Sequence, residues 1–559
     1  MRLLRVLETV ISLSLLGLSA AGIEPREFNV RNFGAKGDGL AVDSPAINTA
    51  IAAAASSGGG TVHLPTGRYL SFSIRLQSRV TLQLDAGAVL VAADPAMTPG
   101  GYDAPEPNPW EKYQDFGHSH WHNSLIWGEG LEEVAIVGPG LIDGTRGLTR
   151  AEPGSRRSAG AMDRGENVDP ALAAVPAGAA NKAIALKNCR GVVLRGFSVL
   201  RGGHFAVLAT GVSRLTIENL AVDTNRDGLD IDTCRDVRIE NCTVNSPNDD
   251  AIVLKASFAL GVPRATENVV IKGCRVSGFD VGTVFNGSRQ RTLNRAPDGD
   301  GPTGRIKIGT ESNGCFRNIV ITDCAFERSR GLALETVDGG IIEDVTVRNL
   351  TMREIVSTPI FLRLGNRARG PEGTPVGAMR RIDLNEITVE DADARYAGIL
   401  IAGLPGHPIE DVALSGIRIG ARGGLSRSIV AQQPAELIAP FFLRGTEAGL
   451  LGPRDPLAVP EREAAYPEPS MFGLLPGSAV YARHVKGVTL RNVAFSEAQP
   501  DTRSRVVLDD AASVTFAGFR VPHPTERPVF VLRHVRDFSL RDAPEFADVR
   551  GKSAEDWSF

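Results

Sequence analysis

Two acidic turns carry the side chains whose types and spacing are best suited to chemistry. The first has the sequence NRDGLD over residues 225–230, and the second has NDDA over residues 248–251. Asp227 and Asp249 are 22 residues apart, and Asp250 follows directly. Three carboxylates held close together cannot all ionise easily, so one of them should keep a proton at neutral pH. A proton donor beside ionised carboxylates is what acid-base hydrolysis of a glycosidic bond needs.

Acidic residues also occur in turns for structural reasons, because Asp and Asn hydrogen-bond the turn backbone. We assign that scaffold role to Asp230 and Asp232. We assign a catalytic role to Asp227, Asp249 and Asp250, since scaffold needs alone do not explain three carboxylates so close together.

The rest of the chain contains a repeated unit that could hold these turns in place. From about residue 130 a nine-residue pattern recurs, with the form polar-V/I-x-I/L-x-x-apolar-x-apolar. Short strands with period-two alternation, repeated every 22 to 26 residues, are typical of a parallel β-helix, in which stacked coils share one core. We therefore predict an all-β fold, a right-handed parallel β-helix. The pattern begins at Gly191, Arg214, Asp236, Asn268, Asn318 and Asp344, and again at Arg381, Asp411, Gly487, Ser513 and Asp537.

The repeat register predicts which turn residues lie above one another. Thirteen residues after the repeats that begin at Gly191, Arg214 and Asp236 stand His204, Asp227 and Asp249. Equal offsets in stacked coils mean equal positions around the helix, and neighbouring strands lie roughly 4.8 Å apart. We therefore predict a column of these three side chains on one face, with Asp250 alongside.

The sequence of the N-terminal part indicates an export signal followed by a cap for the β-helix. Residues 1–22 have a basic start, a short apolar stretch and small residues for cleavage, as in a signal peptide. Asp43 and Ser44 suit a helix N-cap, and residues 46–55 continue as an alanine-rich helix that could close the first coil. We expect a secreted or periplasmic protein, with residues 23–559 forming one β-helix domain.

Composition narrows the possible partners. The 559 residues carry a formal net charge of −4 and no basic run, which argues against a nucleic-acid-binding protein. No apolar stretch is long enough to span a membrane, so we expect no membrane contact once the signal is cleaved. Cys242, Cys274 and Cys324 share the seventh position of their repeats, where other repeats carry Phe or Leu. They are best interpreted as packing residues, and the lack of a CxxC pair argues against zinc.

Four motifs occur together in an order known from one enzyme family. They are NFGAKGDG-x3-DS-x2-AI from Asn32, GPGLIDG over residues 138–144, the N-x-D-G-x-D turn and the paired-Asp turn. Through these motifs, over roughly residues 28–355, the chain resembles glycoside hydrolase family 28, the polygalacturonase and rhamnogalacturonan hydrolase group.

The resemblance implies an inverting hydrolysis of pectic polysaccharide without a cofactor or metal. By position, Asp249 would protonate the leaving oxygen, and Asp227 with Asp250 would activate water. Asn225 matches the asparagine of the family's turn, and Lys255 matches a lysine common after the paired-Asp strand.

The sequence also departs from the family pattern. The family's His falls at Gly304, and the Arg-Ile-Lys strand that grips the substrate carboxylate is replaced by Ala333-Leu334-Glu335. An Arg305-Ile306-Lys307 segment exists, but it lies earlier in the chain. We therefore expect a substrate grip that differs from that of an endo-polygalacturonase, as in a rhamnogalacturonan-type or exo-acting relative.

Several other side chains are candidates for contacting the sugar. His204, Arg289, Arg305 and Glu335 join Asn225 and Lys255 as predicted substrate-binding residues, although each charged group could also be a solvated surface charge.

Two segments could form walls around the site. His118, His120 and His122 would share one face if they lay on a strand, and they could line the substrate, form a plain loop or hold a metal. No acidic or cysteine partner is apparent near them in the sequence. Insertions are expected at about residues 277–317 and 420–486, and the second, with its YPEP segment, could form a wall over the site.

We therefore predict a secreted, inverting glycosidase that acts on galacturonan or rhamnogalacturonan and functions as a monomer. It could act at the ends of the polysaccharide chain. One alternative is a pectate lyase-like β-helix enzyme, which would need calcium and a basic proton acceptor. Another is a non-catalytic β-helix that binds polysaccharide. Sensitivity to chelators would distinguish the lyase, and indifference to Asp249→Asn would indicate the binding protein.

Overall fold

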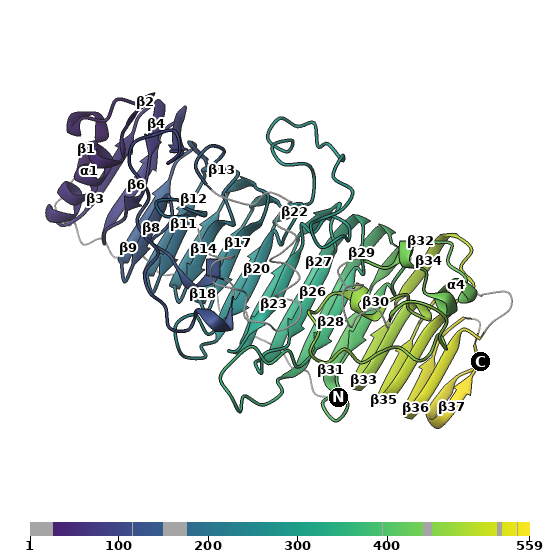
Figure 1. The fold of residues 1–559 in the computed structure, drawn as a ribbon. Helices are drawn as coiled ribbons and strands as arrows, with labels where there is room; N and C mark the ends of the chain where they lie inside the picture. Colours follow the sequence, from purple (N-terminus) through teal and green to yellow (C-terminus); the bar gives the residue numbers. More distant parts are fainter. Residues whose placement is uncertain are drawn as a thin grey trace, which may run out of the picture.

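The protein is a long right-handed parallel β-helix, a rod with β1 (Glu27–Asn29) and α1 (Ser44–Ser56) at one end and β37 (Val549–Ser558) at the other (Figure 1). The computed structural model describes residues 26–114, 116–148, 176–393, 395–439, 450–522, 528–544 and 546–559. The predicted signal peptide lies outside these residues. None of the helices in the described part of the chain is long and apolar enough to cross a membrane.

Each coil contributes strands to three parallel ladders that run along the rod. The ladder that carries the acidic turns is called the catalytic ladder below. It consists of β5 (Ile74–Arg75), β8 (Ile126–Glu129), β11 (Lys182–Lys187), β14 (Phe205–Thr210), β17 (Asp227–Asp232), β20 (Ile252–Ala256), β23 (Ile306–Ser312), β26 (Leu332–Thr336), β28 (Ile360–Leu364) and β30 (Ile399–Ala402).

The second ladder holds most of the repeat motif found in the sequence. It consists of β1 (Glu27–Asn29), β3 (Gly60–Leu64), β6 (Val80–Leu84), β9 (Glu132–Val137), β12 (Arg190–Arg195), β15 (Ser213–Glu218), β18 (Arg235–Glu240), β21 (Thr266–Lys272), β24 (Phe316–Thr322), β27 (Ile341–Ile355), β29 (Ala378–Ala392) and β31 (Ile409–Ser415).

The third ladder leads into the acidic turns, because its strands end just before them. It consists of β2 (Asp38–Val42), β4 (Gly67–Ser71), β7 (Ala88–Ala92), β10 (Leu141–Asp143), β13 (Ser198–Leu200), β16 (Ala221–Asp223), β19 (Thr243–Asn245), β22 (Arg275–Ser277), β25 (Ala325–Glu327), the ends of β27 and β29, β32 (Arg418–Gly423) and β34 (Ala494–Gln499).

Alternation along the strands explains why the coils stack. Val192, Leu215, Val237, Val269 and Ile319 pair in register in five successive coils, and each is at most 1% exposed. Their sequence neighbours point outward, so one apolar column fills the interior while the outer face stays polar.

The turn between the second and third ladders recurs with one fixed backbone conformation. A residue there has a positive φ, which Asn, Asp and Gly tolerate better than other residues. Examples in five consecutive coils are Asn219, Asn241, Gly273, Asp323 and Asn349, with φ from 53° to 66°.

The cysteines act as packing residues, as predicted. Cys242, Cys274 and Cys324 follow register-paired strands in successive coils and are at most 1% exposed. All six cysteines of the chain lie among the described residues and are free.

Both ends of the β-helix are covered. At the N-terminal end lies α1 (Ser44–Ser56), which buries Ile47 and Ile51. The Asp43 carboxylate does not cap this helix but accepts hydrogen bonds from the backbone N–H groups of Lys36 and Gly37, at 2.6 and 3.0 Å.

At the C-terminal end the long strands β33 (Gly477–Arg491), β35 (Ser504–Ala517) and β36 (Phe530–Arg541) lead to β37 (Val549–Ser558), which pairs antiparallel with β36. An aromatic cluster that includes Phe530 and Phe559, stacked at 4.9 Å, fills this end.

Short helices lie in the connections outside the ladders. They are η1 (Val30–Phe33), η2 (Glu111–Tyr113), η3 (Phe116–Ser119), α4 (Arg427–Gln432), η4 (Ala435–Leu437) and η7 (Pro469–Phe472). The two expected insertions lie after β22 and after β32. The first ends earlier than the sequence suggested, because β23 already begins at Ile306.

Substitution of one inward-pointing residue tests the packing. Ile239→Ala should lower the free energy of unfolding by about 2–5 kcal/mol, because Ile239 is fully buried between Ile217 and Ile271 of the adjacent coils. Arg238→Ala, which changes the outward neighbour, should cost no more than about 0.5 kcal/mol. Urea denaturation of both variants measures the difference. Equal losses would contradict the inward and outward assignment.

Candidate active site

The three predicted aspartates meet where the third ladder passes into the catalytic ladder. Asp227 begins β17, and Asp249 and Asp250 lie in the turn between β19 and β20. Each contributes a carboxylate oxygen to a group in which these oxygens all lie within 4.8 Å of one another. The Asp250 backbone N–H also donates to an oxygen of Asp227 at 3.3 Å and to one of Asp249 at 3.1 Å. The stacking of coils therefore produces the predicted carboxylate cluster.

The predicted column through His204, Asp227 and Asp249 is wrong by one residue. Phe205, not His204, pairs with Asp227, and continuing the register of β17 and β20 places Asp250 opposite Asp227. The reason is turn length, because the connections between the third and catalytic ladders differ by one or more residues from coil to coil. The half-buried His204 therefore lies just outside the ladder, with its ring 4.4 Å from that of Phe205.

Asp250 is held as an anion. Its side chain is 3% exposed, Arg305 Nε donates to Oδ1 at 2.6 Å, and Lys307 Nζ lies 3.4 Å from Oδ2. Burial alone would raise the pKa of Asp250, but the two cations outweigh burial and lower it to about 2. This carboxylate can therefore accept a proton or orient water at any ordinary pH.

The environment of Asp227 favours the protonated form instead. Asp227 is 3% exposed, and the Lys255 ammonium lies 3.6 Å from its Oδ2. Burial, and next the Asp249 carboxylate, raise the pKa of Asp227 well above its usual range. The free site therefore favours a proton on Asp227 beside an ionised Asp250.

Asp249 is the most open of the three. Its side chain is 23% exposed, and its Oδ2 lies 2.8 Å from Arg226 Nη2. Asn225 accepts a hydrogen bond from the Asn248 amide at the same edge of the turn. Asp249 and Asn225 are thus placed where a sugar could reach them.

The nearest carboxylate oxygens of the three aspartates lie close together. One oxygen each of Asp227, Asp249 and Asp250 lies within 4.8 Å of the other two. Register pairing of adjacent coils explains this, because it brings turn residues to the strand spacing of about 4.8 Å. The separation of roughly 6.5–9.5 Å expected of an inverting glycosidase refers to whole carboxyl groups and stays a prediction.

The same oxygens are of the type that calcium prefers. However, Asp249 already pairs with Arg226, and Asp250 pairs with Arg305 and Lys307. These cations offset the negative charge that a divalent ion would need.

Lys255 is an internal residue of the site. Its ammonium, 7% exposed, lies 3.1 Å from Asp230 Oδ2 and 3.3 Å from Glu311 Oε2. Burial lowers the pKa of Lys255, but the carboxylates of Asp230 and Glu311 outweigh it and raise the pKa well above its usual range. Lys255 therefore stays charged and balances the buried acids around it.

The two aspartates assigned to the scaffold have different environments. Asp232 fits that role, because Ser257 donates to it from both its backbone N–H and its hydroxyl, at 2.8 and 2.5 Å. Asp230, by contrast, belongs to the buried charge network, with Lys255 on one side and His118 Nε2 at 3.0 Å on the other.

Glu335 and Arg289, two of the predicted substrate-binding residues, both interact with other charged side chains. Glu335 is fully buried and lies 3.3 Å from Lys307 and 4.0 Å from Arg305. Burial raises the pKa of Glu335 to about 7, against the pull of these two cations. The exposed Arg289 instead pairs with Glu327 at 3.4 Å.

The insertion after β32 reaches the site, as expected of a wall. Glu468 accepts two hydrogen bonds from Arg305, at 2.7 and 3.1 Å, and one from Arg330 at 3.0 Å. The Tyr466 hydroxyl lies 3.2 Å from Lys307 Nζ and 3.2 Å from Thr310 Oγ1. The YPEP segment thus fixes the cations that face Asp250.

Gly304 explains why the family's histidine is missing. Its φ is +44°, and a Cβ there would collide with the backbone oxygen of Ser277. The next residue, Arg305, donates to Asp250. A basic side chain is therefore present one position further along.

The three histidines do not share one face, because they lie on a short helix and a loop instead of a strand. Contrary to the sequence interpretation, each has an acidic neighbour. His118 lies near Asp230, His120 Nε2 is 3.0 Å from Glu111, and His122 Nε2 is 2.9 Å from Glu129. His118 alone joins the aspartate cluster.

Two family profiles match parts of the chain. Residues 27–102 match the family described as rhamnogalacturonase A/epimerase, pectate lyase-like, and residues 177–295 match the right-handed β-helix region. A probable polygalacturonase of Vitis vinifera is 24% identical over 431 residues, which cover 73% of this chain and 77% of that protein.

Two solved structures share the fold. A hyperthermoactive exopolygalacturonase from Thermotoga maritima is 21% identical, with a TM-score of 0.51, over 72% of this chain and 88% of that one. A family 28 exopolygalacturonase from Yersinia enterocolitica is 17% identical, with a TM-score of 0.58, over 89% and 78%. These findings support the resemblance to glycoside hydrolase family 28.

The raised pKa of the buried Glu335 predicts how the stability of the fold depends on pH. Its folded-state pKa of about 7 lies above the ordinary value of about 4.3, so the unfolded chain loses this proton at lower pH than the folded chain does. Relative to Glu335→Gln, the free energy of unfolding of the wild type should therefore fall from about pH 4.5 to about pH 7 and level off above. Urea denaturation across this range measures it. A difference that does not change with pH would contradict a protonated, buried Glu335.

Proposed function

We propose that this chain is a glycoside hydrolase that cleaves pectic polysaccharide, galacturonan or rhamnogalacturonan, outside the cytoplasm. The observation that carries the proposal is the carboxylate cluster, in which Asp250 is kept ionised by Arg305 and Lys307 while Asp227 favours a proton. Paired acids with opposed proton affinities are the requirement of acid-base glycoside hydrolysis. The polygalacturonase relatives support the pectic substrate.

The catalytic roles follow the resemblance, with one addition from the geometry. Asp249, the most open carboxyl, protonates the leaving oxygen, and Asp250 with Asp227 activates the attacking water. Because Asp227 and Asp249 belong to the same close group, we infer that the proton favoured on Asp227 in the free site passes to Asp249 when the substrate binds. Asp249 then donates this proton to the leaving oxygen, and Asp227 acts as an ionised base.

We propose that water, and not a carboxylate, is the nucleophile, so that the reaction inverts the anomeric carbon. Two features support this choice over a covalent intermediate. Asp227 and Asp250 both lie close to Asp249, so two carboxylates can orient a water molecule while the third supplies the proton. Asp250, the most strongly ionised of them, is paired with Arg305 and Lys307, which reduces its strength as a nucleophile.

The insertion after β32 and the His118 segment are proposed as side walls of the substrate cleft, because both contribute side chains to the charge network beneath it. We propose action at chain ends, since the exopolygalacturonases of known structure share this fold and the family's usual substrate grip is absent here.

Removal of the Asp249 carboxyl group tests its assignment as the proton donor. Asp249→Asn should lower kcat on pectic oligosaccharides by about 10²–10⁴-fold with the fold intact, because the leaving oxygen receives no proton. A glycoside with an activated leaving group needs no such proton, so its cleavage should fall much less. Asp250→Asn should lose both reactions, since it removes a base.

Rates come from reducing-end assays, with circular dichroism as the fold check. Asp236→Asn is the matched control, because Asp236 is an exposed aspartate near the start of β18, in the same coil region. Wild-type turnover of natural oligosaccharides by Asp249→Asn would contradict the assignment. Equal losses on both substrates would move the acid to another residue.

A further inference from the structure

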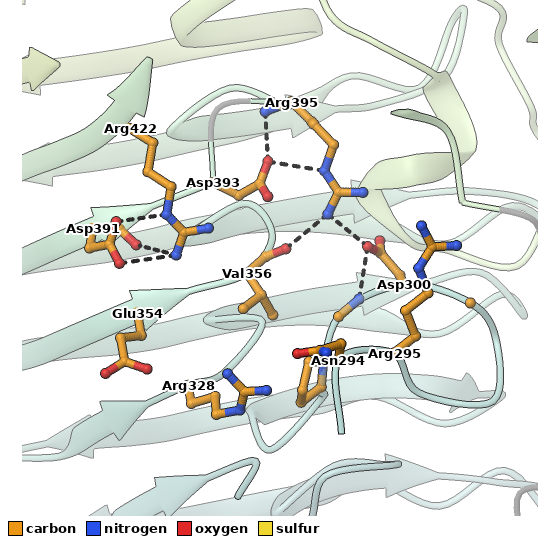
Figure 2. Close-up of a pocket in the computed structure, with 13 residues that line it drawn as sticks. Asn294, Arg295, Asp300, Arg328, Glu354, Val356, Asp391, Asp393, Arg395 and Arg422 are labelled. Carbon is orange, nitrogen blue, oxygen red and sulfur yellow. Dashed lines mark hydrogen bonds and ion pairs between the residues drawn. The ribbon is translucent and has the colours of Figure 1, made fainter. Parts of the chain in front are cut away.

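A second hollow, distinct from the aspartate cluster, lies on the insertion after β22 (Figure 2). It has a volume of about 380 Å³ and is lined by part of that insertion and by residues at or just after the ends of β25, β27, β29 and β32. We call it the arginine pocket, after Arg295, Arg328, Arg395 and Arg422, which line it together with Glu354 and Asp391.

The arginine pocket lies on the same side of the β-helix as the catalytic turns. Asp250 follows β19 of the third ladder, Arg328 follows β25, and Arg422 lies on β32. Successive pairings β19–β22–β25–β27–β29–β32 place these arginines two to five coils beyond the Asp250 turn. At about 4.8 Å a coil, the separation along the axis is roughly 10–24 Å, a distance that several linked sugars could span.

The acids around the pocket already have partners. Arg422 donates to both oxygens of Asp391, at 2.7 and 3.0 Å. Arg395 pairs with two acids of the lining, Asp300 at 2.9 Å and Asp393 at 3.1 Å, as Figure 2 shows. Glu354 accepts from Arg291, outside the lining, at 3.0 and 3.1 Å. Each acid of the lining therefore has an arginine partner, and Asp300 and Asp393 share one, so a further cation of the lining has no carboxylate of its own.

Two arginines supply that further positive charge. Arg295 is exposed and makes no hydrogen bond or ion pair with the residues that the structure describes. Arg328 donates to the Leu293 oxygen at 2.6 Å, but its buried Nε has no partner among the described residues. Burial lowers the pKa of Arg328, and Arg291 adds to this effect against the pull of Glu354. Both guanidinium groups could therefore receive an anion.

We propose that the arginine pocket is a distal subsite that binds the carboxylate of a uronate residue in the chain being cleaved. The inference rests on the proposed function for its choice of ligand. A guanidinium is planar and presents paired donors that match a carboxylate. The volume is near the lower end of small-ligand sites, which suits a single sugar residue. Galacturonan or rhamnogalacturonan would supply such a residue several sugars from the scissile bond.

Binding measured without cleavage tests the subsite. Long and short oligogalacturonates are titrated calorimetrically into the Asp249→Asn protein, with and without Arg295→Gln and Arg328→Gln. The double change should weaken binding of the long oligomer by roughly tenfold and leave the short oligomer unaffected, because only the long one reaches both sites. The loss should shrink at high salt.

Two controls keep the result interpretable. Arg353→Gln changes an exposed arginine on β27 that pairs with Glu390 and does not line the pocket, so it should bind as the parent does. Arg295→Gln alone cannot disturb an internal contact, and it should already weaken long-oligomer binding. Equal affinity of the parent, Arg295→Gln and the double variant for the long oligomer would overturn the proposal.

The outcomes separate the subsite from the proposed function. If the wild type cleaves no pectic oligosaccharide but the arginine changes still weaken long-oligomer binding, the subsite stands and the hydrolase proposal fails. If the wild type cleaves these oligosaccharides and the double variant has an unchanged KM for long ones, the hydrolase proposal stands and the subsite fails.

Discussion

The stacking distance between coils is the constraint on which the rest of this structure depends. Parallel strands about 4.8 Å apart force equivalent turn residues into contact, so Asp227 and Asp250 cannot move apart without breaking the ladder. Like charges at this distance disfavour joint ionisation. The fold therefore sets the proton affinities of the site. Asp250, with Arg305 and Lys307 beside it, ionises, whereas Asp227, whose neighbour Lys255 is shared with two other acids, favours a proton.

Buried cations make the cluster possible, and each is itself held by other acids. Arg305 bridges Asp250 and Glu468, and Lys255 bridges Asp230 and Glu311. A buried charge left without a partner is costly, so removal of any one member should disturb the others. Arg305 reaches Asp250, whereas a side chain at position 304 would collide with the Ser277 backbone.

Much of the fold and the centre of the site could be predicted from the sequence, because both depend on local repeats. Period-two alternation every 22 to 26 residues identified the coils, and the shared seventh position identified Cys242, Cys274 and Cys324 as core residues. The column prediction failed by one residue at His204, since turn lengths vary while strand registers do not. Glu468 contacts Arg305 across 163 residues of sequence, and no repeat pattern encodes such a contact.

The most direct test of the proposed mechanism follows one bond cleavage in oxygen-18-labelled water. A size-defined galacturonan or rhamnogalacturonan oligosaccharide is incubated with the wild-type protein, product masses are measured, and the new anomeric centre is observed by proton NMR before it equilibrates. The mechanism predicts one labelled oxygen at the new reducing end and inverted configuration. Unlabelled, unsaturated products would indicate a lyase, and retained configuration would indicate a covalent intermediate; either result would contradict hydrolysis by water at the aspartate cluster.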